Sequence, residues 1–334
     1  MTEPRPGCSS TPTPTPQSPA RRGWFHLPPQ LSWKRLRWPT LLSLLLVHVL
    51  ALLAFVPHYF SWSGIALLLV GVYVFGTLGI NIGFHRLLTH RSFKTPRWFE
   101  RTLAVIGICN LEGSPINWVA NHRKHHQHAD DEPDPHSPVI AFLWSHVGWL
   151  LVRNPSSNNA EVCGRYARDL CKDRFYFWLE RRLKWTWIYL AHAALFFVAG
   201  FFVGGWIGGD IASGLRLGVS WLIWGVLVRT VVVWHITWSV NSITHLFGYR
   251  NYETGENSRN NWIVGLLALG EGWHNNHHAD QRSAAHGHRW WEFDATYLTI
   301  LLFSRIGLAT RIIPPSHRLK DRKTAEPHHH SHAL

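Results

Sequence analysis

Four apolar runs constrain this fold most, because each one is long enough to cross a lipid bilayer as a helix. They lie at about residues 40–57, 64–84, 185–206 and 215–233. A transmembrane helix needs roughly 20 apolar residues to span about 30 Å of hydrocarbon. Charged residues and histidines fill much of the remaining sequence, so those segments must lie in water. We therefore predict an all-α integral membrane protein with four transmembrane helices.

The distribution of basic residues predicts how these helices are arranged. The link at 57–63 carries no Lys or Arg, and the link between the last two runs carries only Arg216, whereas the other flanks are basic. Cytoplasmic flanks carry the excess of Lys and Arg in membrane proteins. We therefore predict two hairpins, with both termini on the cytoplasmic side. Residues 85–184 and 234–317 would then form a cytosolic helical cap.

Arg229 interrupts the fourth apolar run, where a charge is costly. We expect the helix to leave the bilayer near Arg229 and to continue in the cytosol toward Asn241. The alternative is an arginine that reaches from the membrane edge into water.

The two ends of the chain differ in composition from the rest. Residues 1–33 are rich in Pro, Ser and Thr, and residues 318–334 form a basic, histidine-containing tail. We expect both to be disordered, because they hold too little apolar surface to fold. Residues 34–317 then form one membrane domain.

Cysteine content and net charge narrow the cellular context. The four cysteines, Cys8, Cys109, Cys163 and Cys171, form no CxxC pair, which predicts free thiols in a reducing compartment. The net charge of +13 predicts contact with something acidic, such as lipid headgroups, a redox protein or a phosphate-bearing substrate. No motif for nucleic-acid recognition accompanies this charge.

Histidines recur at fixed spacings beside the apolar runs. HxxHH occurs at 122–126 and at 274–278, and residues i, i+3 and i+4 share one face of a helix. HxxxxH at 85–90 does not fit one α-helical face, so we expect it to straddle the end of the second membrane helix. Asn241 and His245 are four residues apart and can share a face. Imidazole binds iron, zinc and copper, and nine histidines exceed what one ion can use, so we predict two metal ions.

Acids and other histidines near these motifs predict supporting roles. Acids that accept the second N–H of a ligating imidazole would orient it, and exposed or capping roles are equally open to them. The acids are Asp130, Asp131, Asp134, Glu271 and Asp280. We expect packing, surface or supporting roles for the histidines outside the repeated spacings, which are His48, His58, His128, His136, His146 and His235.

Several separated motifs resemble the membrane-bound fatty acid desaturases, in particular the stearoyl-type Δ9 group. The matching blocks are HRLLTH at 85–90, WVANHRKHHQHAD at 118–130, DPH at 134–136, SHVGWLL at 145–151, WSVNSITHLFGYRNY at 238–252 and GEGWHNNHH at 270–278. HGHRWWEFD at 286–294 looks more like the bacterial, cyanobacterial and plant branch than the animal one.

The resemblance implies a fold, a cofactor and a reaction. It implies four transmembrane helices under a cytosolic cap with two irons, and insertion of a cis double bond into a saturated acyl chain with O2 and two electrons. Asn241 matches a position that reaches a metal through water. The ligands carried over are His85, His90, His122, His125, His126, His245, His274, His277 and His278. No separate acid–base residue is expected, because methylene hydrogens are too weakly acidic for a general base and the oxidising chemistry belongs to the metals.

The interpretation as a desaturase also predicts residues that hold the substrate. We expect a narrow apolar tunnel with walls among Trp118, Trp144, Trp149, Trp234, Trp238 and Trp262, although ordinary packing is an alternative for each. Tyr73 would close its far end and limit chain length. Arg123 and Lys124, with Arg86 and Arg91, could hold CoA phosphates or meet a lipid headgroup, so the acyl carrier stays open.

Electrons must come from a separate protein, because no fused haem-binding segment is evident. Ferredoxin, a rubredoxin-type protein or cytochrome b5 would serve, and an acidic donor would suit the net charge. Two other functions remain open. A related di-iron hydroxylase would use much the same ligands, and a metal transporter would need ligands at mid-membrane depth.

Overall fold

The structure is a computed structural model that describes residues 32–131, 134–138, 140–154, 157 and 159–316. Nearly all of the two terminal segments expected to be disordered lies outside these residues, so that expectation stays a prediction. Helices account for the regular structure, and the described residues contain only isolated β-bridges and no strand. The all-α prediction is confirmed.

Four helical stretches are long and apolar enough to cross a membrane, as the sequence predicts. They are Trp38–Phe55, Trp62–Thr89, Arg174–Gly208 and Ile211–His245. The first contains α1 (Trp38–Ala51) and the second contains α2 (Trp62–Gly71) followed by η4 (Val72–Thr89). The third contains α8 (Arg174–Glu180) and α9 (Lys184–Gly208), and the fourth contains α10 (Ile211–Leu222), η7 (Ile223–Val228) and α11 (Arg229–Ser242).

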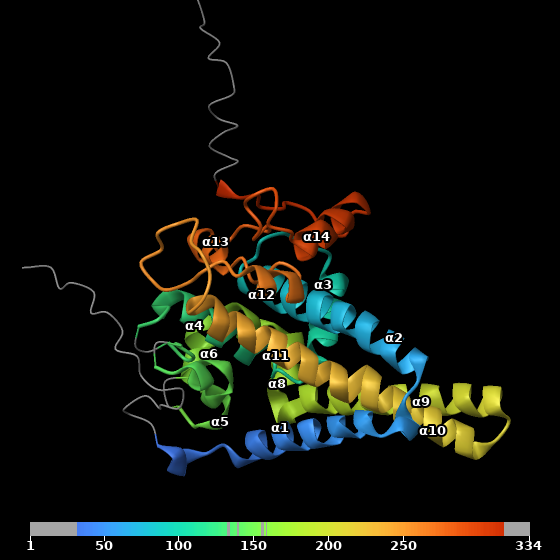
Figure 1. The fold of residues 1–334 in the computed structure, drawn as a ribbon. Helices are drawn as coiled ribbons and strands as arrows, with labels where there is room; N and C mark the ends of the chain where they lie inside the picture. Colours follow the sequence, from blue (N-terminus) through green and yellow to red (C-terminus); the bar gives the residue numbers. More distant parts are fainter. Residues whose placement is uncertain (1–31, 132–133, 139, 155–156, 158, 317–334) are drawn as a thin grey trace, which may run out of the picture.

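These stretches form two hairpins whose turns lie at the same end of the bundle, on the right of Figure 1. The α9–α10 pair packs through glycines: a Cβ on Gly200 would lie 2.9 Å from the Cα of Gly218, and one on Gly204 would lie 2.5 Å from the carbonyl of Ser213. Small residues let membrane helices approach this closely.

The cap lies at the other end of the bundle, on the left and top of Figure 1. Its remaining elements are α3 (Arg97–Ile108), α4 (Pro115–His128), η5 (Trp144–Gly148), α5 (Trp149–Leu151), α6 (Ala160–Tyr166), α7 (Arg168–Lys172), α12 (Trp262–Leu267), α13 (His274–Ala279) and α14 (Ala295–Arg305). Ser114 caps α4, because its hydroxyl accepts from the Asn117 amide at 3.2 Å, and Pro115 suits the first helical position.

The second membrane helix ends at Thr89 with His90 as its C-cap, so HxxxxH straddles the helix end as expected, and this last stretch is π-helical. The amide of His90 donates to the carbonyl of His85 at 3.1 Å, an i→i+5 bond. This wider turn brings the two imidazoles to the same side, with ring centroids 4.8 Å apart. π-Helical turns are rare and frequently mark functional sites.

Arg229 is fully buried, so the alternative of an arginine that reaches water is wrong. Its guanidinium donates to the Cys109 carbonyl at the end of α3 at 2.8 Å and lies 4.0 Å from the Phe75 ring centroid. A Cβ on Gly71 would lie 2.9 Å from Cδ of Arg229, so this glycine makes room for it. The helix does continue past Arg229 to Ser242.

Candidate metal centre and adjoining pocket

The nine predicted histidines form two adjacent groups in the cap. Group A comprises His85, His90, His122, His126 and His277. Group B comprises His125, His245, His274 and His278. Within each group, one ring nitrogen from every histidine lies within 4.8 Å of all the others. The separation into two groups fits two metal ions better than one.

Helices α4 and α13 each contribute to both groups. His122 and His126 of α4 face group A, with their Nε2 atoms 3.0 Å apart, while His125 belongs to group B. α13 does the reverse, since His274 and His278 belong to group B and His277 to group A. The Nε2 atoms of His126 and His277 lie 2.9 Å apart, so side chains of the two helices are in direct contact. Each HxxHH motif therefore contributes histidines to both groups.

The electrostatics favour the neutral form of six of these imidazoles, whereas burial is outweighed by the nearby Asp134 at His125 and the pKa of that imidazole is raised. Burial, reinforced by neighbouring imidazoles, holds the pKa of the cap histidines well below its ordinary value. These histidines are His90, His122, His126, His274, His277 and His278. A neutral imidazole offers a lone pair, and the buried Nε2 atoms of His90 and His125 have no hydrogen-bond partner. The donor set therefore fits metals that prefer nitrogen ligands.

Carboxylates outside the two groups orient three of these imidazole rings. His85 Nδ1 lies 2.6 Å from Glu271, His125 Nδ1 lies 3.0 Å from Asp134, and His245 Nδ1 lies 3.2 Å from Asp130. Such contacts favour the tautomer with the proton on Nδ1, which leaves the Nε2 lone pair free to bind a metal ion. Burial alone would raise the pKa of Asp134, but the neighbouring His125 holds it below its usual range. These three acids thus occupy the role that the sequence suggested.

The other acids behave differently. Asp131 is exposed, and Asp280 accepts from the Ser316 amide at 2.7 Å. Glu256, which the motif spacing could not reveal, lies 3.5 Å from Nδ1 of His278 and 3.8 Å from Nδ1 of His245. It lies in a loop, where no periodic pattern marks it.

Arg86 is not available to a substrate phosphate, in contrast to the expectation. It is fully buried and donates to Glu271 at 2.8 Å and 3.0 Å and to Asp294 at 3.0 Å. Glu271 in turn lies 3.2 Å from Nδ1 of His286, a buried histidine that the motifs did not single out. The network therefore ties His85 to the C-terminal part of the cap.

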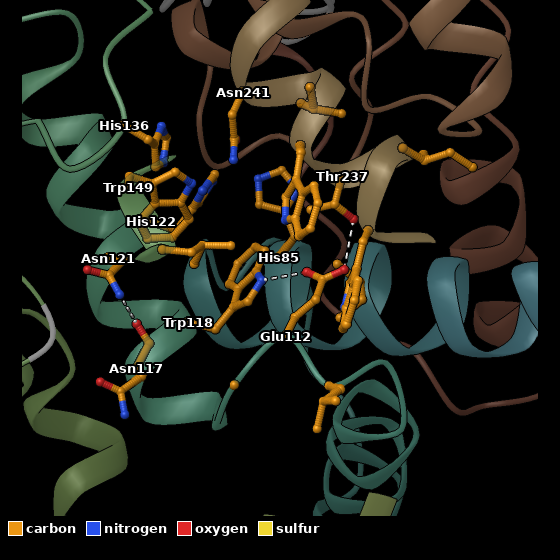
Figure 2. A pocket seen from close by; sticks show the side chains of 18 of the residues that line it. His85, Glu112, Asn117, Trp118, Asn121, His122, His136, Trp149, Thr237 and Asn241 are labelled. Atoms are coloured by element: carbon orange, nitrogen blue, oxygen red, sulfur yellow. Dashed lines mark hydrogen bonds between the residues drawn. The ribbon is translucent and has the colours of Figure 1, made fainter. Parts of the chain in front are cut away.

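A pocket of about 270 Å³ adjoins both groups. Its lining includes His85 and His122 of group A, His274 of group B, and Asn241. Figure 2 shows the Asn241 amide pointing into the pocket from α11, with Trp118 and Glu112 on the opposite side. Its walls also include Arg37, Thr40 and Leu44, so it extends to the start of the first membrane helix.

The structure places some of the expected substrate residues in this pocket. Trp118, Trp149, Trp234 and Trp238 line it. Trp144 instead packs in a small separate core with Ala141 and Val152. Trp262 is 61% exposed on α12 and does not line the pocket. The prediction that it forms a tunnel wall is therefore wrong, because Trp262 and its apolar neighbours lie on the surface of the cap.

Three further expected residues lie away from the pocket lining. Tyr73 is 38% exposed, and its hydroxyl lies 2.7 Å from that of Thr299. Arg123 donates to the Leu88 carbonyl at 2.7 Å and to Asp169 at 2.7 Å. Lys124 is buried. The guanidinium of Arg123 is thus already hydrogen-bonded to a carbonyl at the end of η4 and to Asp169, and it links η4 to the rest of the cap.

Glu112 is a pocket residue that the sequence gave no reason to select. It accepts from the Trp118 indole at 3.2 Å and from the Thr237 hydroxyl at 3.0 Å, as Figure 2 shows. Burial raises its pKa to about 7. It is an isolated acid in a loop, and only the folded chain brings it beside Thr237.

Comparisons with known proteins agree with this geometry. A family model described as fatty acid desaturase matches residues 60–302. An sn-1 stearoyl-lipid 9-desaturase of Anabaena variabilis is 43% identical over 289 residues, which cover 86% of this chain and 96% of the relative. An sn-2 palmitoyl-lipid 9-desaturase of Nostoc sp. (strain 36) is 39% identical over 284 residues, with 84% and 92% covered. An acyl-CoA 5-desaturase of Anemone leveillei is 42% identical over 272 residues, with 81% and 77% covered. The chain therefore belongs to the fatty acid desaturase family.

Proposed function

We propose that this enzyme is an O2-dependent Δ9 desaturase that inserts a cis double bond into a saturated acyl chain of a membrane lipid. The reaction converts –CH2–CH2–, O2, two electrons and two protons into –CH=CH– and two waters. The observation that carries the proposal is the pocket that begins at the first membrane helix and ends on histidines of both groups. A pocket of this kind brings one part of an acyl chain beside both groups.

Two iron ions are the metals that this reaction requires. We propose that group A holds one and that group B, with Asn241 nearby, holds the other. The irons would supply the oxidising power, drawn from O2, that removes hydrogen from unactivated methylenes. The support is the all-imidazole donor set, the lowered pKa values of six of its nine histidines, and the carboxylates behind His85, His125 and His245.

The protein's own contribution is to position the chain and exclude water. Trp118 stacks on His122 with ring centroids 5.0 Å apart, and its indole N–H is fixed by Glu112. Thr237 holds the same carboxyl from α11. This link between α11 and the segment before α4 defines the wall nearest the metals, where a fixed path would select one C–C bond.

The acyl carrier is proposed to be a lipid with an anionic headgroup. Arg37 lines the outer part of the pocket, and burial together with the nearby Arg153 lowers its pKa. The Arg37 guanidinium donates to the Leu150 carbonyl at 3.4 Å, and neither arginine is in a salt bridge among the described residues, so we propose that the pair receives a phosphate. The pocket reaches α1 at the membrane boundary, where the sn-1 chain of a lipid could enter. Relatives named for lipid-linked and for CoA-linked substrates both occur, so the carrier needs a direct test.

We also propose that both termini and the metal centre face the cytoplasm. The basic flanks support this orientation. The two hairpin turns lie at the end of the bundle away from the histidines, as the orientation requires.

The test is the fatty acid profile of a desaturase-deficient host that expresses the chain, with double bonds located by mass spectrometry. We expect new cis-9 monoenes with the wild type and none with His125→Ala. Purified enzyme given labelled stearoyl phosphatidylglycerol or stearoyl-CoA then separates the carriers. Turnover of the CoA ester alone would refute the lipid proposal, and a hydroxylated product would refute desaturation.

A further inference from the structure

Group A has a second opening, on the side away from the pocket. A groove of about 620 Å³ lies between the end of η4, α4, the α6–α7 segment and residues 281–282. We call it the arginine groove. His90 and His126 line it, whereas His85 and His122 line the pocket, and the two cavities share no lining residue. Group A therefore lies between an opening for the acyl chain and a separate opening to the cap surface.

The arginine groove is strongly basic. Five arginines and one acid, Asp169, occur among its described lining residues. Arg91 and Arg123 both pair with Asp169. Arg165, Arg168 and Arg282 are exposed and form no salt bridge within the described part of the chain. The carboxylate is thus already used, and three guanidiniums face outward without a counter-charge.

The lining also shows what the groove is not built for. Its described residues are arginines, histidines, Thr89, Gln127, Gln281, Tyr166 and Asp169, with no aliphatic side chain among them. An acyl chain would find no apolar wall there. Two imidazoles of group A, His90 and His126, line this charged groove. A donor protein bound in the groove would therefore approach the side chains that we propose as metal ligands.

We propose that the arginine groove is the docking site of an acidic one-electron carrier protein, which delivers electrons to group A on the His90–His126 side. The proposal rests on the desaturase function proposed above, which consumes two electrons per double bond. Two reduced carriers, each oxidised by one electron, complete one turnover. Opposite charge on the two surfaces would speed encounter and make it sensitive to salt.

The experiment measures steady-state turnover of iron-loaded enzyme in lipid nanodiscs, driven by reduced plant-type ferredoxin, an acidic carrier. The variant is Arg165→Glu with Arg168→Glu, and a second variant is Arg282→Glu. Arg305→Glu is the matched control, because Arg305 is exposed at the end of α14 and outside the groove. The readouts are the KM for ferredoxin and its dependence on salt. Single turnover after reduction with dithionite is measured in parallel, since it needs no docking.

We expect the double variant to raise the KM for ferredoxin about tenfold or more and to weaken its salt dependence, with dithionite-driven single turnover unchanged. Arg305→Glu should match the wild type. An unchanged KM, or an equal change in the control, would overturn the proposal. So would a change in KM for the acyl lipid instead, which would assign the groove to an anionic acyl carrier. If wild-type enzyme turns over with dithionite but accepts electrons from neither ferredoxin nor cytochrome b5, the acidic-carrier proposal also fails. Absence of product with dithionite would refute the proposed function itself.

Discussion

Replacing Glu112 with Gln should remove a pH-dependent destabilisation of the folded enzyme. Burial raises the pKa of Glu112 from 4.5 to about 7. The folded state therefore binds more protons than the unfolded state between these values. Stability from this group is fully present below about pH 4.5 and is lost as pH rises through 7.

The size of the effect follows from the same shift. Each pKa unit corresponds to about 1.4 kcal/mol, so the loss approaches about 3 kcal/mol above pH 8 and about 2.5 kcal/mol between pH 5 and pH 8. Because Glu112 is only partly buried, solvent screening makes these upper values. Gln has no charge and still offers an oxygen to Trp118 or Thr237.

The assay is thermal unfolding of wild type and Glu112→Gln in lipid nanodiscs across this pH range. We expect the variant's Tm to equal the wild type's near pH 5 and to exceed it by several degrees at pH 8, at roughly 2–4 °C per kcal/mol. Parallel pH profiles for the two proteins would refute the reasoning, because they would mean that Glu112 ionises without cost in its folded surroundings.

Three further predictions test other parts of the structure. Glu271→Gln removes the carboxylate behind His85 and should weaken iron binding at group A about 10- to 100-fold. The iron content measured by mass spectrometry should fall accordingly. Asp280→Asn is the control and should keep both irons, because the Asp280 carboxylate accepts from the Ser316 amide. Gly204→Ala places a Cβ 2.5 Å from the Ser213 carbonyl and should destabilise the α9–α10 hairpin by roughly 1–3 kcal/mol in thermal denaturation. Gly205→Ala should have little effect, because the nearest atom to its Cβ lies at 3.7 Å. Equal losses of stability in the two variants would contradict this packing. Trp262→Ala should leave the fatty acid profile unchanged while Trp118→Ala lowers the monoene yield, and a reversed order would mean that the acyl chain takes another route.

The sequence by itself determined the four spans and the identity of the nine clustered histidines. Both are local properties. A run of apolar residues must leave water wherever it occurs, and HxxHH presents its histidines together in any helix. The family resemblance rested on the same short motifs, and it was confirmed by the match over residues 60–302.

Only the tertiary structure decided how those histidines are shared and what surrounds them. His122 and His126 separate from His125 because the histidines of α13 meet those of α4, with His277 in one group and His274 and His278 in the other. Spacing within one helix cannot reveal which side chains of a second helix it meets. The burial of Arg86, the exposure of Trp262 and the position of Glu112 beside Thr237 depend on contacts between residues far apart in the chain. Burial and charge pairing arise only when such segments pack together, so no local pattern could have given them.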